Sequence, residues 1–519
     1  MTDLLAIRLQ RLAEQQDGLF GDSRIGIEKE CLRVTVDGTI ARTPHPLALG
    51  SALEHRFITT DYSEALLEFV TPPATSAWEP LQFLCDLHQF THAAIGDEIL
   101  WPMSMPCRIE SDSDVPLARY GSSNVGKMKT VYRRGLGYRY GRRMQAIAGI
   151  HFNYSPPDDF WPLFRELEKS GNDLVTFRSA AYMALIRNVR RFGWLLSYLF
   201  GASAAIVKPF PDLGNVRLET LKPDTLYGPY ATSLRMSDIG YQHANQASIN
   251  VSANSIDEYI DGLARAIHTP CENYQRIGVK DGDEYRQLNA NILQIENEYY
   301  GAIRPKRVAR SGERPTHALR RGGVEYVELR AIDVSPFDPV GINQDQIRFL
   351  ETFLVYCLLE DSPPIEAAEQ RINTDNQSTV AAEGRRPGLQ LQRTDGPVGL
   401  ADWAQQICAR ILRVARFMDP DRSGGMVAAV KKQMRLVDDP ALTPSARMID
   451  EIEENGGSFL DYAMTVGRGF AEYFRAMDPQ LNTNWTLLVD EARESLERQA
   501  ARESADTLTF DQYVEKCCS

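Results

Sequence analysis

The segment GIEKECLRV (Gly26–Val34) has the alternating pattern of a half-buried β-strand. Successive side chains of a strand point to opposite faces, so Glu28 and Glu30 share one face. Cys31 then lies on the other face, where we expect it to pack in the core. The segment VEYVELRAIDV, which begins at Val324, repeats the arrangement and places Glu328 and Arg330 on one face. These paired polar side chains predict a strand face that binds a ligand.

Three further segments are predicted to be strands with one polar face: QAIAGIHFNYS (145–155), YATSLRMS (230–237) and ILQIENEYY (292–300). The side chains on these polar faces are His151, Asn153 and Ser155; Ser233, Arg235 and Ser237; and Gln294, Glu296, Glu298 and Tyr300. One interpretation is a half-exposed antiparallel sheet with a solvated outer face, which is common. The other is a single sheet whose polar face lines a binding site. The residue types favour the second, because Glu, His, Arg and Tyr bind metals, carboxylates and phosphates.

Two more acids follow in ITTDYSEALLEFV, where a predicted turn leaves Asp61 at its start and Glu68 on the next strand. With Glu28, Glu30 and Glu328 they make five carboxylates. Facing one cavity, these would repel each other and have raised pKa values unless a cation neutralised them. The chain has no HExxH motif and no Cys/His cluster, which argues against zinc. Oxygen ligands suit Mg²⁺ or Mn²⁺ bound together with substrate phosphates, so the acids predict a metal–nucleotide site.

Composition excludes several classes of partner and location. The net charge of −13 over 519 residues argues against nucleic acid and against an anionic membrane surface. No apolar run approaches the ~18 residues of a membrane span. The chain opens on an amphipathic helical pattern rather than a leader. Its eight cysteines include no CxxC pair, which is typical of a reduced cytoplasmic protein.

A near-match to a phosphate-binding loop, GSSNVGKM (121–128), ends in Met128, which has no hydroxyl to place on Mg²⁺. No βαβ pattern surrounds it, so we do not expect a phosphate-binding loop here. The basic residues that follow are expected to form a mostly solvated helix face, with one or two reaching phosphate. They are Lys127, Lys129, Arg133, Arg134, Arg139, Arg142 and Arg143. Arg304, Lys306 and Arg307 are further candidate phosphate ligands.

The pattern along the chain predicts an α+β fold. Helices are expected over 1–20, 78–97 and 172–205, and strands over 24–75 and 228–335. We expect a catalytic α+β domain over 1–360 and a boundary or excursion over 361–400, which is poor in large apolar residues. A mostly helical region over 401–519 is expected to pack on the catalytic part.

Many long blocks, in order, carry a resemblance that covers nearly the whole chain. They are GIEKECLRV, HPLALGSALEHRFITTDYSEALLEFVTP, WPMSMPC, RYGSSNVGKMKTVYRRGLGYRYG, AGIHFNYS, RFGWLLSYLFGAS, YATSLRMSDIGY, LQIENEYYGAIRPKRVARSGE and LRRGGVEYVELRAIDVSPFDPVGI. The chain resembles the glutamate–cysteine ligases of proteobacterial type. This implies a glutamine-synthetase-like fold, in which a curved, largely antiparallel sheet forms a funnel-shaped active site with helices outside.

The resemblance also implies roles for individual residues. It places magnesium among Glu28, Glu30, Asp61, Glu68 and Glu328. Arg330 matches the family's phosphate-contacting arginine and Arg235 the arginine near the amino-acid substrates, while Gly149, Ile150 and His151 fall where glutamate binds. The cysteine pocket of the family is aromatic, and the positions that fall in it are Tyr62, Tyr132, Leu136, Tyr241 and Tyr300. Position 62 is more usually Phe, so the hydroxyl of Tyr62 is expected to alter the thiol pocket.

The implied reaction joins the γ-carboxylate of glutamate to the amino group of cysteine at the expense of ATP, through an acyl phosphate. Glutamate, cysteine and ATP are the expected small-molecule substrates, Arg304 and Lys306 are candidate nucleotide ligands, and glutathione is a candidate feedback inhibitor. Two alternatives remain open: a related carboxylate–amine ligase with another amine acceptor, and a non-catalytic nucleotide- or metal-binding module.

Overall fold

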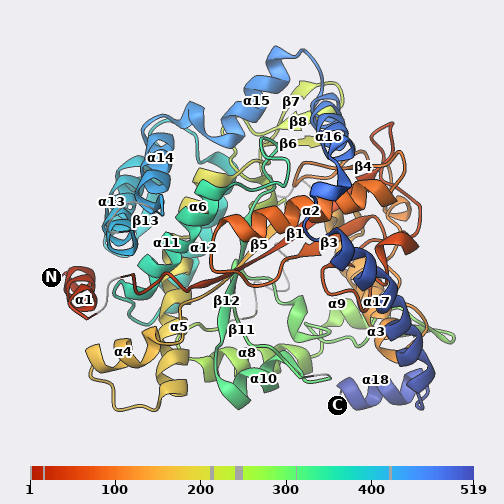
Figure 1. Ribbon diagram of the computed structural model, residues 1–519, viewed down its shortest axis with the longest axis horizontal. Helices are drawn as coiled ribbons and strands as arrows, with labels where there is room; N and C mark the ends of the chain where they lie inside the picture. Colours follow the sequence, from red (N-terminus) through yellow and green to blue (C-terminus); the bar gives the residue numbers. More distant parts are fainter. Residues whose placement is uncertain are drawn as a thin grey trace.

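An antiparallel sheet in the strand order β11–β12–β5–β1–β3–β2 crosses the middle of the molecule, with β4 paired to β1 (Figure 1). The computed structural model describes residues 3–15, 18–210, 216–239, 249, 251–310, 312–419 and 424–518. The strands of this sheet are β1 (Arg24–Val34), β2 (Ile58–Thr60), β3 (Leu66–Val70), β4 (Ile99–Leu100), β5 (Ile150–Ser155), β11 (Ile303–Lys306) and β12 (Tyr326–Ile332). The expected α+β class and largely antiparallel sheet are confirmed.

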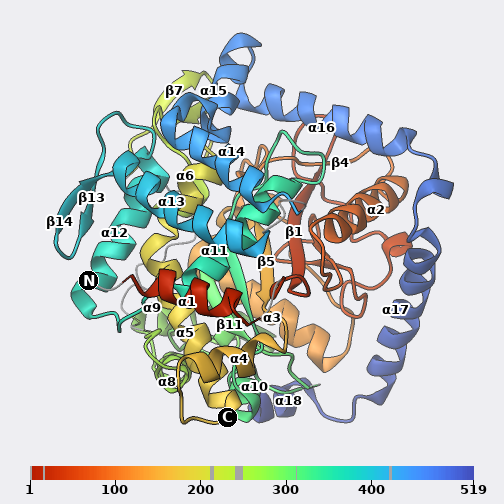
Figure 2. The ribbon, with the colours of Figure 1, turned by 60° about the vertical axis from the view of Figure 1, so that its left-hand side comes forward.

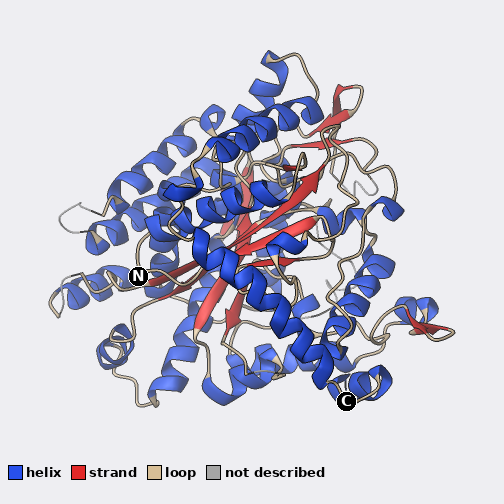
Figure 3. Ribbon diagram, turned by 45° about the vertical axis from the view of Figure 1, so that its right-hand side comes forward, coloured by secondary structure: helices blue, strands red, loops and turns tan. Residues whose placement is uncertain are grey.

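Helices surround the sheet on several sides (Figure 3). Those up to β12 are α1 (Leu4–Ala13), α2 (Trp78–Ala94), α3 (Asn124–Tyr140), α4 (Phe160–Leu167), α5 (Leu174–Phe192), α6 (Trp194–Phe200), α8 (Ile256–His268), α9 (Glu272–Ile277) and α10 (Pro315–Gly322). Those after β12 are α11 (Gln344–Leu359), α12 (Ala367–Glu383), α13 (Leu400–Met418), α14 (Met426–Asp438), α15 (Pro444–Glu454), α16 (Phe459–Ala476), α17 (Trp485–Ala505) and α18 (Phe510–Cys518). No helix among the described residues is long and apolar enough to cross a membrane.

Three small sheets lie outside the central one. They are β6 (Ala205–Val207), β8 (Thr225–Tyr227) and β7 (Glu219–Lys222); β9 (Lys280–Asp281) with β10 (Glu284–Tyr285); and β13 (Gln390–Arg393) with β14 (Gly396–Gly399). The stretch 361–400 contains α12 and the β13–β14 hairpin, and α12 packs against α5 and α6. The division of the chain into domains stays a prediction.

One face of the central sheet is apolar and forms the core. Ile27, Phe152 and Leu329 lie on it and are fully buried. Helices α2, α5, α6 and α11 contact the strands β1, β11, β12 and β5, respectively. Fully burying one large apolar side chain contributes roughly 1.5–3 kcal/mol, so the core anchors each strand with this face inward. The other face is left for polar side chains.

Helix α17 lies along the outer surface (Figure 2) and contacts Leu47–Leu49, in the chain that leads into β2. The buried carboxylate of Glu491 accepts hydrogen bonds from the backbone N–H and the guanidinium of Arg56, at 2.9 and 2.8 Å. The hydroxyl of Ser495 accepts from the Ser51 backbone N–H at 3.0 Å. The helix therefore fixes the segment that precedes Asp61.

Glu351 in α11 is a buried acid on the core side of the sheet. Burial raises its pKa to about 8, and hydrogen bonding to Ser23 only partly opposes this. A carboxyl whose pKa is higher in the folded than in the unfolded state stabilises the fold most below its unfolded pKa. That stabilisation is lost as the pH rises toward the folded pKa.

We therefore predict that Glu351→Gln raises the melting temperature relative to the unmodified protein more at pH 8 than at pH 5. The gap in unfolding free energy should grow by at most about 1.4 kcal/mol per pH unit. Thermal unfolding of both proteins in matched buffers measures it. Parallel pH profiles would show that Glu351 does not titrate in this range.

Candidate active site

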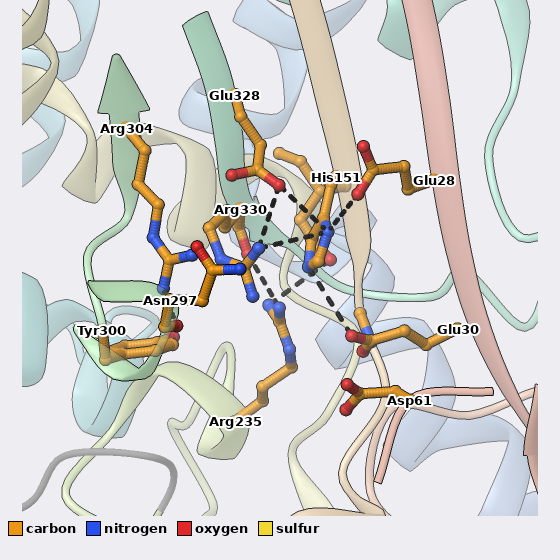
Figure 4. A network of polar contacts seen from close by, with 12 residues as sticks. Glu28, Glu30, Asp61, His151, Arg235, Asn297, Tyr300, Arg304, Glu328 and Arg330 are labelled. Atoms are coloured by element: carbon orange, nitrogen blue, oxygen red, sulfur yellow. Dashed lines mark hydrogen bonds and ion pairs between the residues drawn. The ribbon is translucent and has the colours of Figure 1, made fainter. Parts of the chain in front are cut away.

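Two strands, β1 and β12, bring carboxylates to the imidazole of His151 on β5, on the polar face of the sheet (Figure 4). In the strand register, Glu28 pairs with His151 and Glu328 pairs with Asn153, so all four share a face. The Nδ1 atom of His151 lies 3.0 Å from Glu28 Oε2 and 3.6 Å from Glu328 Oε1. Its Nε2 atom lies 3.7 Å from Glu30 Oε1. The predicted convergence of acids from distant parts of the chain is confirmed for these residues.

The remaining two acids stand on the β2–β3 side. Glu68 pairs with Glu30 in the register, and Asp61 follows β2 directly. Burial raises the pKa of Glu68 well above its usual value, and the Glu28, Asp61 and Glu30 carboxylates raise it further. Burial also raises the pKa of Glu30. If Glu30 and Glu68 were both ionised, this side of the site would therefore carry negative charge that the protein's own cations do not offset.

The opposite side of the site is rich in cations. Arg330 Nη1 lies 3.0 Å from Glu328 Oε1, and Lys306 Nζ lies 3.2 Å from Glu328 Oε2. Burial alone would raise the pKa of Glu328, but Arg330, Lys306 and His151 outweigh it and hold that pKa below its usual value. Arg304, the cross-strand partner of Glu328, adds a fourth positive contribution. A negatively charged ligand would find compensating charge at this end.

Arg235 does not lie on a strand, contrary to the prediction for 230–237. Residues Leu234–Met236 form a 3₁₀ turn, capped by the Ser233 hydroxyl, because this side chain accepts the Met236 N–H. The Arg235 guanidinium lies against Gly149, where any Cβ would collide with it. Its Nη2 donates to the Arg330 carbonyl oxygen at 2.7 Å. Gly149 itself donates its N–H to Glu30 at 2.7 Å.

Asp333 is a buried acid that the sequence did not single out, although it is the penultimate residue of the VEYVELRAIDV stretch. It lies 3.7 Å from Arg235 Nη1. Its carboxylate also accepts hydrogen bonds from the Ala202 N–H at 2.9 Å and from the hydroxyls of Ser203 and Ser233 at 2.6 and 3.0 Å. Ser203 lies far from Ser233 and from Asp333 in the chain, so these three residues come together only in the folded protein. Asp333 holds the turn that carries Arg235.

The strand predicted over 292–300 is likewise a 3₁₀ turn, Glu296–Glu298. Glu298 points into a buried network and accepts hydrogen bonds from Arg139 at 2.9 Å and from Tyr140 at 2.6 Å. Glu296 accepts a hydrogen bond from the Thr316 hydroxyl at 2.8 Å. The alternating pattern misled here because a short turn can carry polar side chains at the same spacing as one face of a strand.

The residues expected in the cysteine pocket come from separate elements. Tyr132 and Leu136 are four residues apart on α3 and share one helix face. Tyr62 is 1% exposed, and its hydroxyl has no hydrogen-bond partner within the described chain. Tyr300 places its hydroxyl 3.3 Å from Met236 Sδ. These roles stay predictions.

Tyr241, one of the residues predicted to contact substrate, lies outside the described residues. Ile150 is fully buried, and its side chain lies on the apolar face, opposite to that of His151. Only its backbone is left to face the site.

The GSSNVGKM segment leads into α3, and the Ser123 hydroxyl caps this helix by accepting the Gly126 N–H. The element before this segment in the described chain is the 3₁₀ turn Asp112–Asp114 and not a strand, so it lacks the strand–loop–helix context of a phosphate-binding loop. Of the basic residues on α3, Arg133 approaches the site, with Nη2 3.9 Å from Asp61 Oδ1. Arg139 is buried against Glu298 instead of being solvated.

A divalent cation fits the acidic side of the site. Ligand atoms of Glu28, Glu68 and His151 all lie within 4.8 Å of one another. The closely spaced carboxylates described above, half-buried at Glu28 and Glu68, are the charge that such an ion would neutralise. Carboxylate oxygens predominate, and these suit Mg²⁺ and Mn²⁺.

Comparison with known proteins identifies the family. The sequence model of the glutamate-cysteine ligase family matches residues 9–380. The chain is 50% identical to the glutamate–cysteine ligase of Alcanivorax borkumensis, over 95% of this chain and 94% of that protein. It is 48% identical to that of Pseudomonas putida, over 99% and 98%. The solved structure of the Francisella tularensis glutamate–cysteine ligase in complex with AMP superposes with a TM-score of 0.90 at 36% identity, over 96% of this chain and 97% of that one. The chain therefore belongs to the glutamate–cysteine ligase family.

Proposed function

We propose that the protein ligates the γ-carboxylate of L-glutamate to the amino group of L-cysteine. ATP is consumed through a γ-glutamyl phosphate, and the products are γ-glutamylcysteine, ADP and phosphate. This is the first step of glutathione synthesis. One observation carries the proposal: carboxylates from three strands share one face of the sheet with Arg330, which contacts Glu328, in a chain of this family.

The chemical problem is that a carboxylate is a poor electrophile. Transfer of the γ-phosphoryl group of ATP to the glutamate γ-carboxylate makes an acyl phosphate. The cysteine amino group then attacks the acyl carbon, and phosphate leaves. The protein needs no covalent nucleophile for this route, so its contribution is positioning and charge neutralisation.

The acidic side and the basic side of the site make different contributions to positioning and charge neutralisation. Glu28, Glu68 and His151 would hold a divalent cation, with Glu30, Asp61 and Glu328 beside them. When bound, such an ion, Mg²⁺ in our proposal, neutralises phosphate oxygens of the nucleotide. Arg330 and Lys306 supply fixed positive charge for the transferred phosphoryl group. The guanidinium of Arg235, aligned against Gly149, suits a substrate carboxylate.

Cysteine as the amine acceptor is supported by the family and by the aromatic residues Tyr62, Tyr132 and Tyr300. Glutathione contains the γ-glutamylcysteine unit, so we propose it as a feedback inhibitor of the same site. The six cysteines whose state the structure describes are free thiols, which supports a cytoplasmic enzyme.

Release of inorganic phosphate from ATP, with glutamate and cysteine each omitted in turn, tests the function. We expect full turnover only with both amino acids, and γ-glutamylcysteine as the product by mass spectrometry. Equal or faster turnover with another amine would support the alternative acceptor. Tight binding of MgATP without turnover would support a non-catalytic module.

For Arg330→Ala we expect a loss of about 10²–10³ in kcat, since removing one preorganised charge contact typically costs this much. Steady-state phosphate release measures it, and an unchanged melting temperature would separate chemistry from folding. Arg330→Lys is the matched control: it keeps the charge and should recover part of the loss. Near-normal turnover of the alanine variant would remove Arg330 from the mechanism.

The raised pKa of Glu68 gives a pH dependence with a definite sign. In the metal-free protein this carboxyl keeps its proton to higher pH, so protons compete with the cation. We predict that the Mg²⁺ concentration giving half-maximal activity rises as the pH falls from 8 to 6.5. Glu68→Gln should raise this concentration at pH 8 and flatten its pH dependence. Identical Mg²⁺ titrations of the two proteins would count against Glu68 as a ligand.

Asp333 acts through Arg235, so Asp333→Asn should weaken amino-acid binding more than it slows chemistry. The amide keeps the shape but loses the charge that faces Arg235. We expect KM for glutamate or cysteine to rise about 10-fold, because a hydrogen bond to a charged group contributes about 1.5–3 kcal/mol. The KM for ATP should stay within twofold. If only thermal stability changed, Asp333 would have a purely structural role.

A further inference from the structure

Helix α3 has a charge pattern that does not stabilise it. Its 17 residues contain no Asp or Glu, and its cations are Lys127, Lys129, Arg133, Arg134 and Arg139. The helix therefore has no acid in its first turn and no pair of opposite charges one turn apart. Two of its lysines also stand near the positive end of the helix dipole, which disfavours them.

The glycines of α3 weaken it further. Glycine has a low helix propensity, and this helix contains Gly126, Gly135 and Gly137. The site requires at least one of them, because a Cβ at Gly137 would collide with the hydroxyl of Tyr62. Most of the stability of a helix in a protein comes from tertiary contacts, and α3 depends on them strongly.

The end of α17 supplies negative charge at the start of α3. The Ser122 N–H donates to Glu503 Oε1 at 2.7 Å, and the Asn124 N–H donates to the Asp506 carboxylate. The Asn124 side-chain amide donates to the Leu508 carbonyl oxygen at 2.9 Å. The N–H groups at the start of a helix have no partner inside it, and the helix dipole favours carboxylates there. Glu503 and Asp506 therefore form a cap for α3 that comes from a distant part of the chain.

Helix α18 packs on the same half of α3 (Figure 1). Val514 of α18 is buried against Val131 of α3 and Leu288. Phe510 and Tyr132 border this small cluster. Apolar packing from α18 and carboxylates from α17 thus hold the first two turns of α3 together.

The other end of α3 is held by a buried ion pair. Arg139 Nη1 lies 2.9 Å from Glu298 Oε1, and both side chains are almost fully buried. Glu503, in contrast, is only half-buried and Asp506 is exposed. Contacts of exposed charges are weaker than those of buried pairs, and segments held by them open more readily. The beginning of α3 is therefore the end that can open.

The side chains that α3 directs at the site follow this labile half. Tyr132 and Leu136 are the residues expected in the cysteine pocket. Between them, Arg133 donates from Nε to the Asp61 carbonyl oxygen, and its Nη2 lies 3.9 Å from Asp61 Oδ1. Fraying of the first two turns would displace this group. Apparent affinity for a ligand falls in proportion to the fraction of molecules in the binding conformation.

We propose that Glu503 and Asp506 are positioning residues for the amine acceptor. Their carboxylates cap α3 from outside and keep the turn that carries Tyr132 and Leu136 in its binding geometry. They act through α3 and do not touch the substrate. This assignment rests on the proposed function, because it uses the expected place of cysteine beside these two side chains.

Two double variants test the cap by steady-state kinetics. Glu503→Ala with Asp506→Ala removes both acceptors, and we expect KM for cysteine to rise about 10-fold, as for a competent fraction of about one tenth. Glu503→Gln with Asp506→Asn keeps the acceptors but loses the charge, and its KM should rise about threefold. The KM for ATP and kcat at saturating cysteine should stay within twofold, because a bound acceptor restores the formed helix.

Glu497→Ala is the matched control. It removes an exposed acid of the same helix, whose printed contact is to Arg493 of α17 itself at 3.3 Å. We expect this variant to have the kinetics of the unmodified protein. Melting temperatures of all variants report folding.

Hydrogen–deuterium exchange of the unliganded proteins reports on α3 without turnover. Backbone amides of residues 125–131 should exchange at least fivefold faster in the alanine double variant than in the unmodified protein. Those of residues 136–140 should be unchanged, because Glu298 holds that end.

Two outcomes overturn the assignment. One is unchanged exchange over residues 125–131. The other is faster exchange with a KM for cysteine that rises no more than the KM for ATP, which would make the cap purely structural. Failure of phosphate release in the unmodified protein would instead overturn the proposed function, and this role with it. If the alanine double variant does not fold, the same measurements on the amide double variant decide.

Discussion

Repulsion between buried carboxylates is the constraint on which the rest of the site depends. Glu28, Glu30 and Glu68 face the same side of two paired strands, and burial raises the pKa of the last two. Water cannot screen these charges well in a low-dielectric interior, so without a metal ion the carboxyls keep protons to higher pH, and a bound cation would replace those protons. The strands tolerate this repulsion because their other faces are anchored in the core.

The back of β1 shows how strictly the sheet separates its two faces. Lys29 stands between Glu28 and Glu30 in the sequence, yet its side chain points to the core and contacts His88 Nε2 at 2.6 Å. Burial lowers the pKa of Lys29 to about 8. A lysine that could neutralise the cluster is therefore held away from it, which leaves the negative charge available to a metal ion.

Positive charge is concentrated instead at the β11–β12 end, where Arg330 and Lys306 contact Glu328. The site thus has an acidic side on β1 and β3 and a basic side on β11 and β12. A metal–nucleotide substrate has the complementary pattern of a cation beside phosphate oxygens. The C-terminal helices contribute from outside: α17 fixes the chain that leads to Asp61, and α18 packs on α3, which carries Tyr132 and Leu136.

Strand periodicity determined much of this protein from the sequence alone. It put Glu28 with Glu30, His151 with Asn153 and Glu328 with Arg330, because the side chains of residues i and i+2 share a face whatever the strand pairs with. The same rule failed for Arg235 and Glu296, whose segments are 3₁₀ turns. Local alternation does not distinguish a short strand from a turn that tertiary contacts hold.

Only the tertiary structure decided which faces meet. The pairing of Glu30 with Glu68, the position of Arg235 against Gly149 and the contacts of Asp333 with Ser203 and Ser233 join residues far apart in the chain. Their geometry depends on strand register and on the packing of the whole core. A sequence pattern reports the local backbone period, but it contains no distance between segments that the fold brings together.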